Sequence, residues 1–84
     1  MPTQKVYCFF DRVSQGFLPN FFLMPNDDVA KRSFSNFANN PKFPFADIKS
    51  DLEIYKVADF DVEQGLSDLK KEFVCALVDL VRGE

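Results

Sequence analysis

The chain contains no histidine and no tryptophan, and only three glycines and two cysteines among its 84 residues. The absence of histidine removes Ser-His-Asp and Cys-His catalysis, together with the commonest general base and the commonest zinc ligand. Serine, threonine and lysine side chains are present, but no spaced acid–base constellation accompanies them. We therefore expect a protein that is not an enzyme and that carries no cofactor.

Disulfides and membrane spans are also not expected. Cys8 and Cys75 lie far apart within apolar runs, which is typical of free thiols in a core. The longest purely apolar stretch, Phe73 to Val78, is much shorter than the ~18 residues that a membrane-spanning helix needs. The N-terminus lacks a signal-like basic start followed by a long apolar segment. These features predict a soluble protein that does not enter the membrane.

Basic residues are fewer than acidic residues in this chain. Ten Lys and Arg residues against thirteen Asp and Glu residues give a net charge of −3. Such a chain does not coat nucleic acid by bulk charge, so any contact with DNA requires a local basic patch on an acidic body.

Aromatic side chains, in contrast, are abundant. Eleven Phe and two Tyr residues make up 15% of the chain. A domain of this size buries only about 60% of its unfolded surface, and aromatic rings build a core quickly. The same rings also serve as stacking platforms and interfaces, so their location decides the functional interpretation.

The first half of the chain predicts a hairpin followed by a helix. Residues 5–11 alternate apolar side chains on two faces, with Val6, Cys8 and Phe10 on one face and Tyr7 and Phe9 on the other. A turn at residues 14–16 leads to a second strand over residues 17–24, in which Pro19 indicates an edge strand or a bulge. Asn26 is a suitable N-cap for a helix that Asn39-Asn40-Pro41 ends.

The second half predicts a strand and a second helix. Residues 52–61 form the third strand, and Ser67 caps a helix from Asp68 to about Arg82. The apolar side chains of this helix spread over an arc of about 200°, wider than the ~100° stripe of a surface helix. We therefore expect residues 67–82 to pack against a second copy or a partner. The candidate interface residues are Phe73, Val74, Leu77, Val78 and Val81.

These elements predict one α+β domain spanning residues 1–84, with the topology β-β-α-β-α. The sheet is expected to be three-stranded and antiparallel in the order 2-1-3, with two helices packed on it, because the first helix carries the chain to the free side of strand one.

A single-stranded DNA site needs aromatic faces for the bases and cations for the phosphates. Tyr7, Phe9 and Tyr55 are expected to share one face of the sheet. Lys5 and Arg12 flank the first strand and Lys56 lies in the third, and Lys42 and Lys49 in the loop after the first helix are candidate phosphate ligands. The alternative is that the second helix or a dimer partner covers this face, and the rings are then core.

Two other charged groups favour ordinary surface roles. Lys31 and Arg32 each follow an aspartate by one helical turn, which is typical of a solvated, salt-bridged face. Asp59, Asp61 and Glu63 alternate at the end of the third strand and could in principle hold Mg²⁺ or Ca²⁺, but no fourth ligand is matched to them. We expect no metal site.

Several segments together resemble the small nonstructural protein of gokushoviruses, the tailless single-stranded DNA phages of the Microviridae. The resemblance covers about residues 5 to 65 as many short matches in the same order. The chain departs from the family pattern at Ala58, where the family usually has glycine, and at Lys49-Ser50, where it usually has a proline. The matching features are Val6-Tyr7, Phe10-Asp11, Pro19, Phe21-Phe22, Asn26-Asp27, Ala30, Arg32-Ser33-Phe34, Asn39-Asn40-Pro41, Asp51 to Lys56, Phe60-Asp61 and Gly65.

The resemblance implies a nonstructural role in single-stranded DNA replication or packaging in the host cytoplasm. We therefore expect a non-catalytic, homodimeric bacteriophage protein that binds single-stranded DNA. The alternative is a protein–protein adaptor that recruits capsid, replication or host proteins without touching DNA. A metal-dependent nuclease is a third hypothesis.

Overall fold

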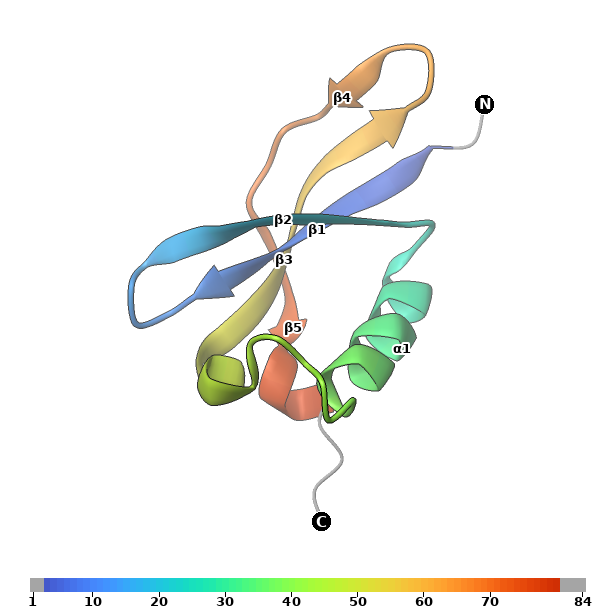
Figure 1. The fold of residues 1–84 in the computed structure, drawn as a ribbon. Coiled ribbons are helices and arrows are strands. Elements are labelled where there is room, and N and C mark those ends of the chain that lie inside the picture. The colour runs from blue at the N-terminus through green and yellow to red at the C-terminus, as the bar shows by residue number, and fades with distance from the viewer. Residues whose placement is uncertain (1–2, 81–84) are drawn as a thin grey trace.

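The computed structural model describes residues 3–80, and Figure 1 shows their fold, an antiparallel sheet with one α-helix packed on it. The predicted α+β class is confirmed. The elements in chain order are β1 (Gln4–Asp11), β2 (Gly16–Met24), α1 (Asp27–Ala38), the 3-10 helix η1 (Ala46–Asp51), β3 (Leu52–Asp61), β4 (Gly65–Ser67), β5 (Glu72–Ala76) and the 3-10 helix η2 (Leu77–Leu80).

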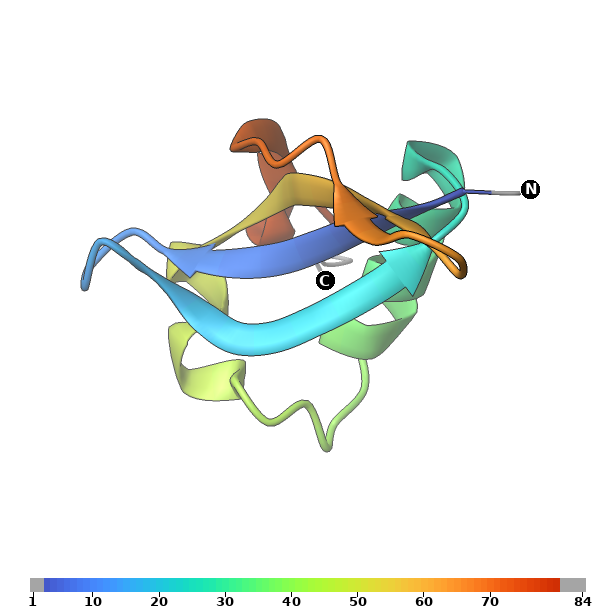
Figure 2. The same cartoon turned by 90° about the horizontal axis from the view of Figure 1, so that it is seen from above.

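The predicted order 2-1-3 is present in the sheet. Figure 2 shows β1 between β2 and β3, and both pairings are antiparallel. Pro19 lies in the edge strand β2, next to an irregularity in its pairing with β1 between Cys8 and Phe10. A proline is tolerated there because the ladder does not need its missing N–H.

The first helix follows its sequence signals closely. The Asn26 side chain accepts a hydrogen bond from the Val29 backbone N–H, which caps α1 as expected. Ala30, Phe34 and Ala38 form its buried face, at the three- to four-residue spacing of an amphipathic helix. Asn39 is the C-cap, so the helix ends where the sequence predicts.

The predicted second helix is wrong over the residues that the structure describes. Residues 67–80 contain the end of β4, strand β5 and η2, while residues 81 and 82 lie outside the described part of the chain. A short apolar run fits a buried strand as well as a helix, and the choice falls to the rest of the fold. Here β3 offers an unpaired edge, and Phe73 pairs with Tyr55 and Cys75 with Ile54.

The sheet consequently has five strands rather than three. Strand β4 pairs with the C-terminal part of β3, from Asp59 to Asp61, and β5 pairs with its N-terminal part, from Glu53 to Lys56. One edge of β3 is thus divided between two short strands. In Figure 1 the hairpin of β3 and β4 extends away from the part of the sheet that α1 covers.

The core lies between one face of the sheet and α1. We call this the inner face. Phe9 is fully buried at its centre, with ring centroids of five other phenylalanines 5.3 to 6.5 Å away. The buried residues of this cluster are Tyr7, Phe9, Ala30, Phe34, Ala38, Phe43, Leu52, Ile54 and Leu77.

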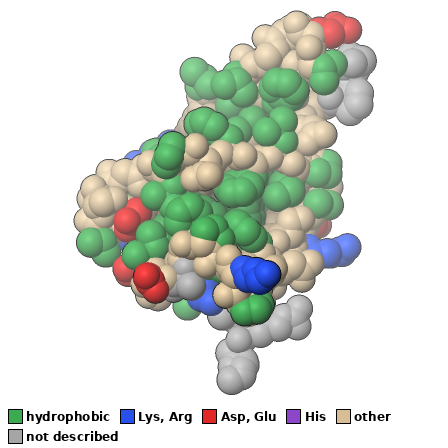
Figure 3. All heavy atoms as spheres, in the orientation of Figure 1, with side chains coloured by type: hydrophobic (Ala, Val, Ile, Leu, Met, Phe, Trp, Pro, Cys, Tyr) green, Lys and Arg blue, Asp and Glu red, His purple; other side chains and the backbone are tan. Residues whose placement is uncertain are grey.

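The opposite face of the sheet, which we call the outer face, is also apolar. It carries Val6 and Phe10 from β1, and the pairing places Leu23 opposite Val6 and Phe17 opposite Phe10. Many of its side chains are exposed, and Figure 3 shows hydrophobic side chains gathered over the β3–β4 hairpin. An open apolar face of this kind is unusual for an isolated soluble domain.

Candidate functional site

Tyr7 and Phe9 belong to the core and not to an open stacking surface, because both are fully buried under α1. The Tyr7 ring meets Phe34 edge to face at 6.1 Å. Tyr55 lies on the other face, since it pairs with Cys8 rather than with a residue of the inner face. The expectation that these three rings share one face is therefore wrong. Tyr7 and Phe9 are core residues, as in the alternative interpretation, but α1 covers them rather than the second helix or a dimer partner.

A partly buried polar contact ties the Tyr7 end of the core to the helix. The Tyr7 hydroxyl donates a hydrogen bond of 2.5 Å to Asp27 Oδ1, and Lys56 Nζ lies 3.3 Å from the same oxygen. The Tyr7 hydrogen bond, with help from Lys56, holds the pKa of Asp27 below its usual range. Burial and the carboxylate raise the pKa of Tyr7 well above its usual range. Lys56 is only 13% exposed and also pairs with Glu72, so it is poorly placed for a phosphate.

Lys5 and Arg12 lie at opposite ends of β1 and are engaged with the protein itself. Lys5 Nζ is 3.3 Å from Asp59 Oδ1. The Arg12 guanidinium donates to the Ser50 carbonyl and lies within 4.0 Å of Glu53. The structure therefore does not bring these two predicted phosphate ligands to one site.

Lys42 and Lys49 also lie apart from the sheet's outer face. Lys42 is exposed in the loop after α1. Lys49 Nζ donates to the Ala38 carbonyl at 3.1 Å and lies 6.0 Å from the centre of the Phe43 ring. Lys49 thus binds the C-terminal end of α1, where carbonyl groups favour a cation.

The residues that the structure does bring together are Phe10, Phe17, Tyr55 and Phe73, with Lys71 above them. We call this group the Lys71 aromatic cluster. The Lys71 ammonium lies 4.8 Å from the centre of the Phe10 ring, 5.8 Å from that of Phe17 and 5.7 Å from that of Tyr55. Phe73 meets Tyr55 edge to face at 5.6 Å and is half exposed. This is a cation held over an accessible aromatic surface.

The pairings Phe10 with Phe17 and Tyr55 with Phe73 create this cluster. Tyr55 is the residue of the predicted binding set that belongs to it. The sequence interpretation missed Lys71 because it assigned residue 71 to a helix. Lys71 would have been identified if the segment after it had been recognised as a strand that pairs with β3.

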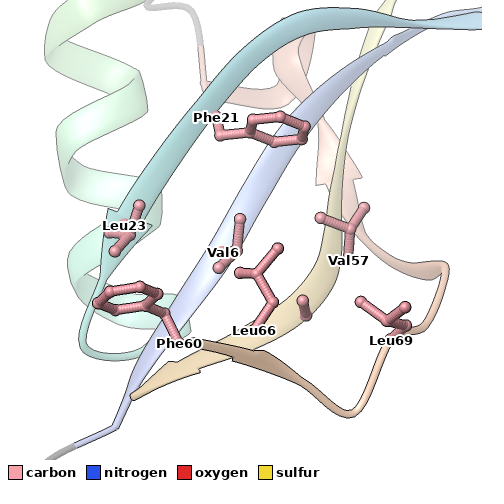
Figure 4. A pocket seen from close by; sticks show the side chains of 8 residues that line it. Val6, Phe21, Leu23, Val57, Phe60, Leu66 and Leu69 are labelled. Atoms are coloured by element: carbon pink, nitrogen blue, oxygen red, sulfur yellow. The ribbon is translucent and has the colours of Figure 1, made fainter. Parts of the chain in front are cut away.

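A hollow lies further along the outer face, toward the β3–β4 hairpin. We call it the outer-face groove. Its volume is about 580 Å³, and Figure 4 shows the side chains that line it. Phe21 and Leu69 stand at its sides and are largely exposed. All eight lining residues are apolar: Val6, Phe21, Leu23, Val57, Ala58, Phe60, Leu66 and Leu69.

The predicted interface residues do not form one surface, because they lie in a strand and a 3-10 helix instead of a single helix. Phe73 is half exposed on the outer face and Val78 is half exposed in η2. Leu77 is fully buried in the core, and Val74 packs against that core. Val81 lies outside the described residues.

A scan of protein families matches residues 4–80 to the family described as Phage ORF5 protein. The chain belongs to this phage family. No curated protein and no solved structure matches it. Over the described residues of this Phage ORF5 protein, no helix is long and apolar enough to cross a membrane.

The Asp59 and Asp61 carboxylates near the end of β3 form ion pairs and hydrogen bonds with other residues of the Phage ORF5 protein. Asp59 Oδ1 contacts Lys5 and Lys70, and Asp61 Oδ1 accepts a hydrogen bond from the Glu63 backbone N–H. Across residues 3–80, no three His, Cys, Asp or Glu residues are grouped so that they could hold a metal ion.

Both cysteines are free thiols. Cys8 is buried in β1 and Cys75 is partly buried in β5. Burial raises the pKa of each thiol, which lowers its reactivity.

Proposed function

We propose that this Phage ORF5 protein is a non-catalytic nonstructural protein of a gokushovirus-like phage, and that it binds single-stranded DNA during genome replication or packaging in the host cytoplasm. Membership of a phage protein family supports the viral part of the proposal. The observation that carries the DNA-binding part is the Lys71 aromatic cluster.

Binding without sequence preference requires π-faces beside positive charge. Stacking is worth roughly 1–3 kcal/mol per base, and it tolerates any sequence because every base has a π-face. Phe17 and Phe73 are the most accessible rings of the cluster and are the stacking surfaces in this proposal. On binding, a base takes the place of the Lys71 ammonium over the rings, and the ammonium turns to the neighbouring phosphate.

The surrounding charges set the expected strength of binding. Glu53 and Glu72 lie in the strands that carry the cluster, and the whole chain is acidic. With one cation in the cluster, stacking must supply most of the affinity. We therefore expect weak binding by one copy and a shallow salt dependence.

The test is fluorescence anisotropy of a labelled single strand of about 20 nucleotides at two salt concentrations, with duplex as the comparison. Phe73→Ser should weaken binding about 5- to 150-fold, which corresponds to the loss of one stacked base. Lys71→Gln should weaken binding and lower the slope of log affinity against log salt by about 0.7, the value for one phosphate contact on a single strand.

Matched controls separate the cluster from the rest of the surface. Val29→Ser removes an exposed apolar side chain of α1 outside the cluster and outside the outer-face groove, and Lys42→Gln removes an exposed lysine far from the cluster. Neither should change the affinity by more than about twofold if the site is the Lys71 aromatic cluster. Absence of binding by the unaltered protein at low salt would exclude direct DNA recognition and would leave the adaptor function.

A further inference from the structure

We propose that the outer-face groove is the docking site for a second copy of this chain, so that two sheets pack face to face in a twofold dimer. The proposal goes beyond the proposed function and does not depend on DNA binding. It also places the dimer interface on a different surface from the one that the sequence predicts.

The groove region exposes more apolar surface than scattered surface residues do. Phe21 is 66% exposed and Leu69 is 77% exposed, and Leu23 and Leu66 add to the same patch. Together these four side chains expose on the order of 400 Å² of apolar surface, which is the size of the largest apolar patch on a typical monomer, a patch that is often functional. A second sheet laid on this face would remove that surface from water.

The shape of the patch allows it to fit a copy of itself. Val6 and Ala58 are buried and form the floor of the hollow, while Phe21 and Leu69 project beside it. In a twofold interface the same patch is present on both sides, so a projecting side chain of one copy can enter the hollow of the other. Sheets packed face to face lie about 10 Å apart, a distance that interdigitating side chains fill.

The charges around the groove also favour a copy over an anionic partner. Lys5 and Lys70 both contact Asp59, at 3.3 and 3.7 Å, and Lys70 contacts Asp68 at 2.8 Å. The nearest cations are thus neutralised, which leaves little for a nucleic acid or an acidic lipid to bind. A neutral apolar patch is instead suited to a twofold interface, where any net charge would meet its own sign.

The dimensions of the molecule suit such an interface. It measures 42 × 25 × 19 Å, so its broad side has room for the roughly 800 Å² per partner that a standard interface buries.

The described C-terminal end of the chain does not cover the groove, because Leu80 packs against the core and Ser35 of α1 donates to the Leu80 carbonyl. That end lies on the inner side of the sheet.

The Lys71 aromatic cluster lies toward the other end of the outer face, away from the β3–β4 hairpin. Its strand residues pair near the turn of the β1–β2 hairpin, whereas the groove residues lie near Val6 and Phe60. Docking centred on the groove would therefore give a dimer with two such clusters.

The test is sedimentation equilibrium of the full chain without DNA. We expect a mass of twice 9.7 kDa for the unaltered protein at about 50 µM. Leu69→Asp should raise the dimer dissociation constant at least 100-fold, because it would bury a carboxylate in an apolar interface. Val13→Asp is the matched control, since Val13 is 75% exposed in the β1–β2 turn, and it should leave the dimer unchanged.

Two outcomes would overturn the proposal. A monomeric unaltered chain at 100 µM would leave the groove to a different protein partner, and a dimer that resists Leu69→Asp would place the interface elsewhere. Circular dichroism and thermal unfolding verify that the variant is folded, and Leu66→Ser serves as a second substitution if it is not. Because DNA is absent, the result is independent of the outcome of the anisotropy test.

Discussion

Replacing Phe9 tests the division of the sheet into a buried inner face and an open outer face. The sequence alone made Phe9 a candidate for base stacking, whereas the structure buries it completely among five other phenylalanine rings. Phe9→Leu should therefore destabilise the protein and leave the affinity for DNA of the remaining folded molecules unchanged.

The magnitude follows from the burial of the ring. Phe→Ala in a packed core costs about 3–5 kcal/mol, because it combines lost burial with a cavity. An 84-residue domain has a total stability of about 4–13 kcal/mol, so Phe9→Ala could unfold the chain. Phe9→Leu keeps most of the apolar volume, and we expect a loss of about 1–2 kcal/mol. For a domain of this size, that corresponds to a fall of about 4–16 °C in Tm.

Urea unfolding followed by circular dichroism measures this loss. The midpoint should fall while the slope with urea stays the same, since a conservative core substitution does not alter the surface exposed on unfolding. Phe21→Leu is the matched control, because Phe21 is an exposed ring on the outer face, and it should change the free energy of unfolding by less than about 0.5 kcal/mol in the monomer. A Phe9→Leu protein of unchanged stability and reduced DNA affinity would refute the assignment of the faces.

Three further predictions concern single positions. Asn26→Ala should lower stability by about 1 kcal/mol through loss of the α1 cap, whereas Asn36→Ala on the exposed side of the same helix should not, as measured by thermal unfolding. The pKa of Asp27 is below its ordinary value of 3.8 in the fold, so its contribution to stability is present above that pH and is lost as the pH falls through the lowered value. Asp27→Asn should accordingly flatten the acid side of the stability profile, measured as urea midpoints between about pH 5 and pH 2. Gly65→Ala should cost about 1 kcal/mol because Gly65 has φ +79° with open space around it, and Gly16→Ala, with no positive φ, should cost less in the same thermal assay.

The sequence predicts the first half of the fold correctly because its signals are local. Alternation along β1 separates Val6, Cys8 and Phe10 from Tyr7 and Phe9, and the cap at Asn26 lies within three residues of the group that it binds. The second half depends on distant residues. The segment from Phe73 to Ala76 is extended because it meets the open edge of β3, and helical periodicity carries no information about that edge.

The expectation that Tyr7, Phe9 and Tyr55 share one face fails because it depends on the register of β3 against β1, which the sequence does not specify. Tyr55 pairs with Cys8 and therefore lies on the face opposite to Tyr7 and Phe9. A shift in the same pairing changes the facing of residues further along β3. Alternation places Ala58 on the same face as Ile54, but the pairing of β1 with β3 shifts between Val6 and Tyr7. Beyond this shift Ala58 pairs with Val6 and lines the outer-face groove, while Ile54 remains in the core. A bulge reverses the facing of every residue that follows it, so which rings share a surface cannot be read from a strand pattern alone.

The central position of β1 has a consequence for the order in which the protein forms. This strand is made early and is apolar on both faces, but its partner β3 is more than forty residues further along the chain, with Lys5 paired to Asp59. Pairing over such a separation closes a long loop and makes folding slow compared with that of helical proteins of the same size. During synthesis the apolar side chains of the β1–β2 hairpin therefore remain exposed to solvent until β3 has been synthesised and can pair with β1. The yield of folded protein should therefore depend on the rate of translation and on the concentration of incomplete chains that expose this hairpin.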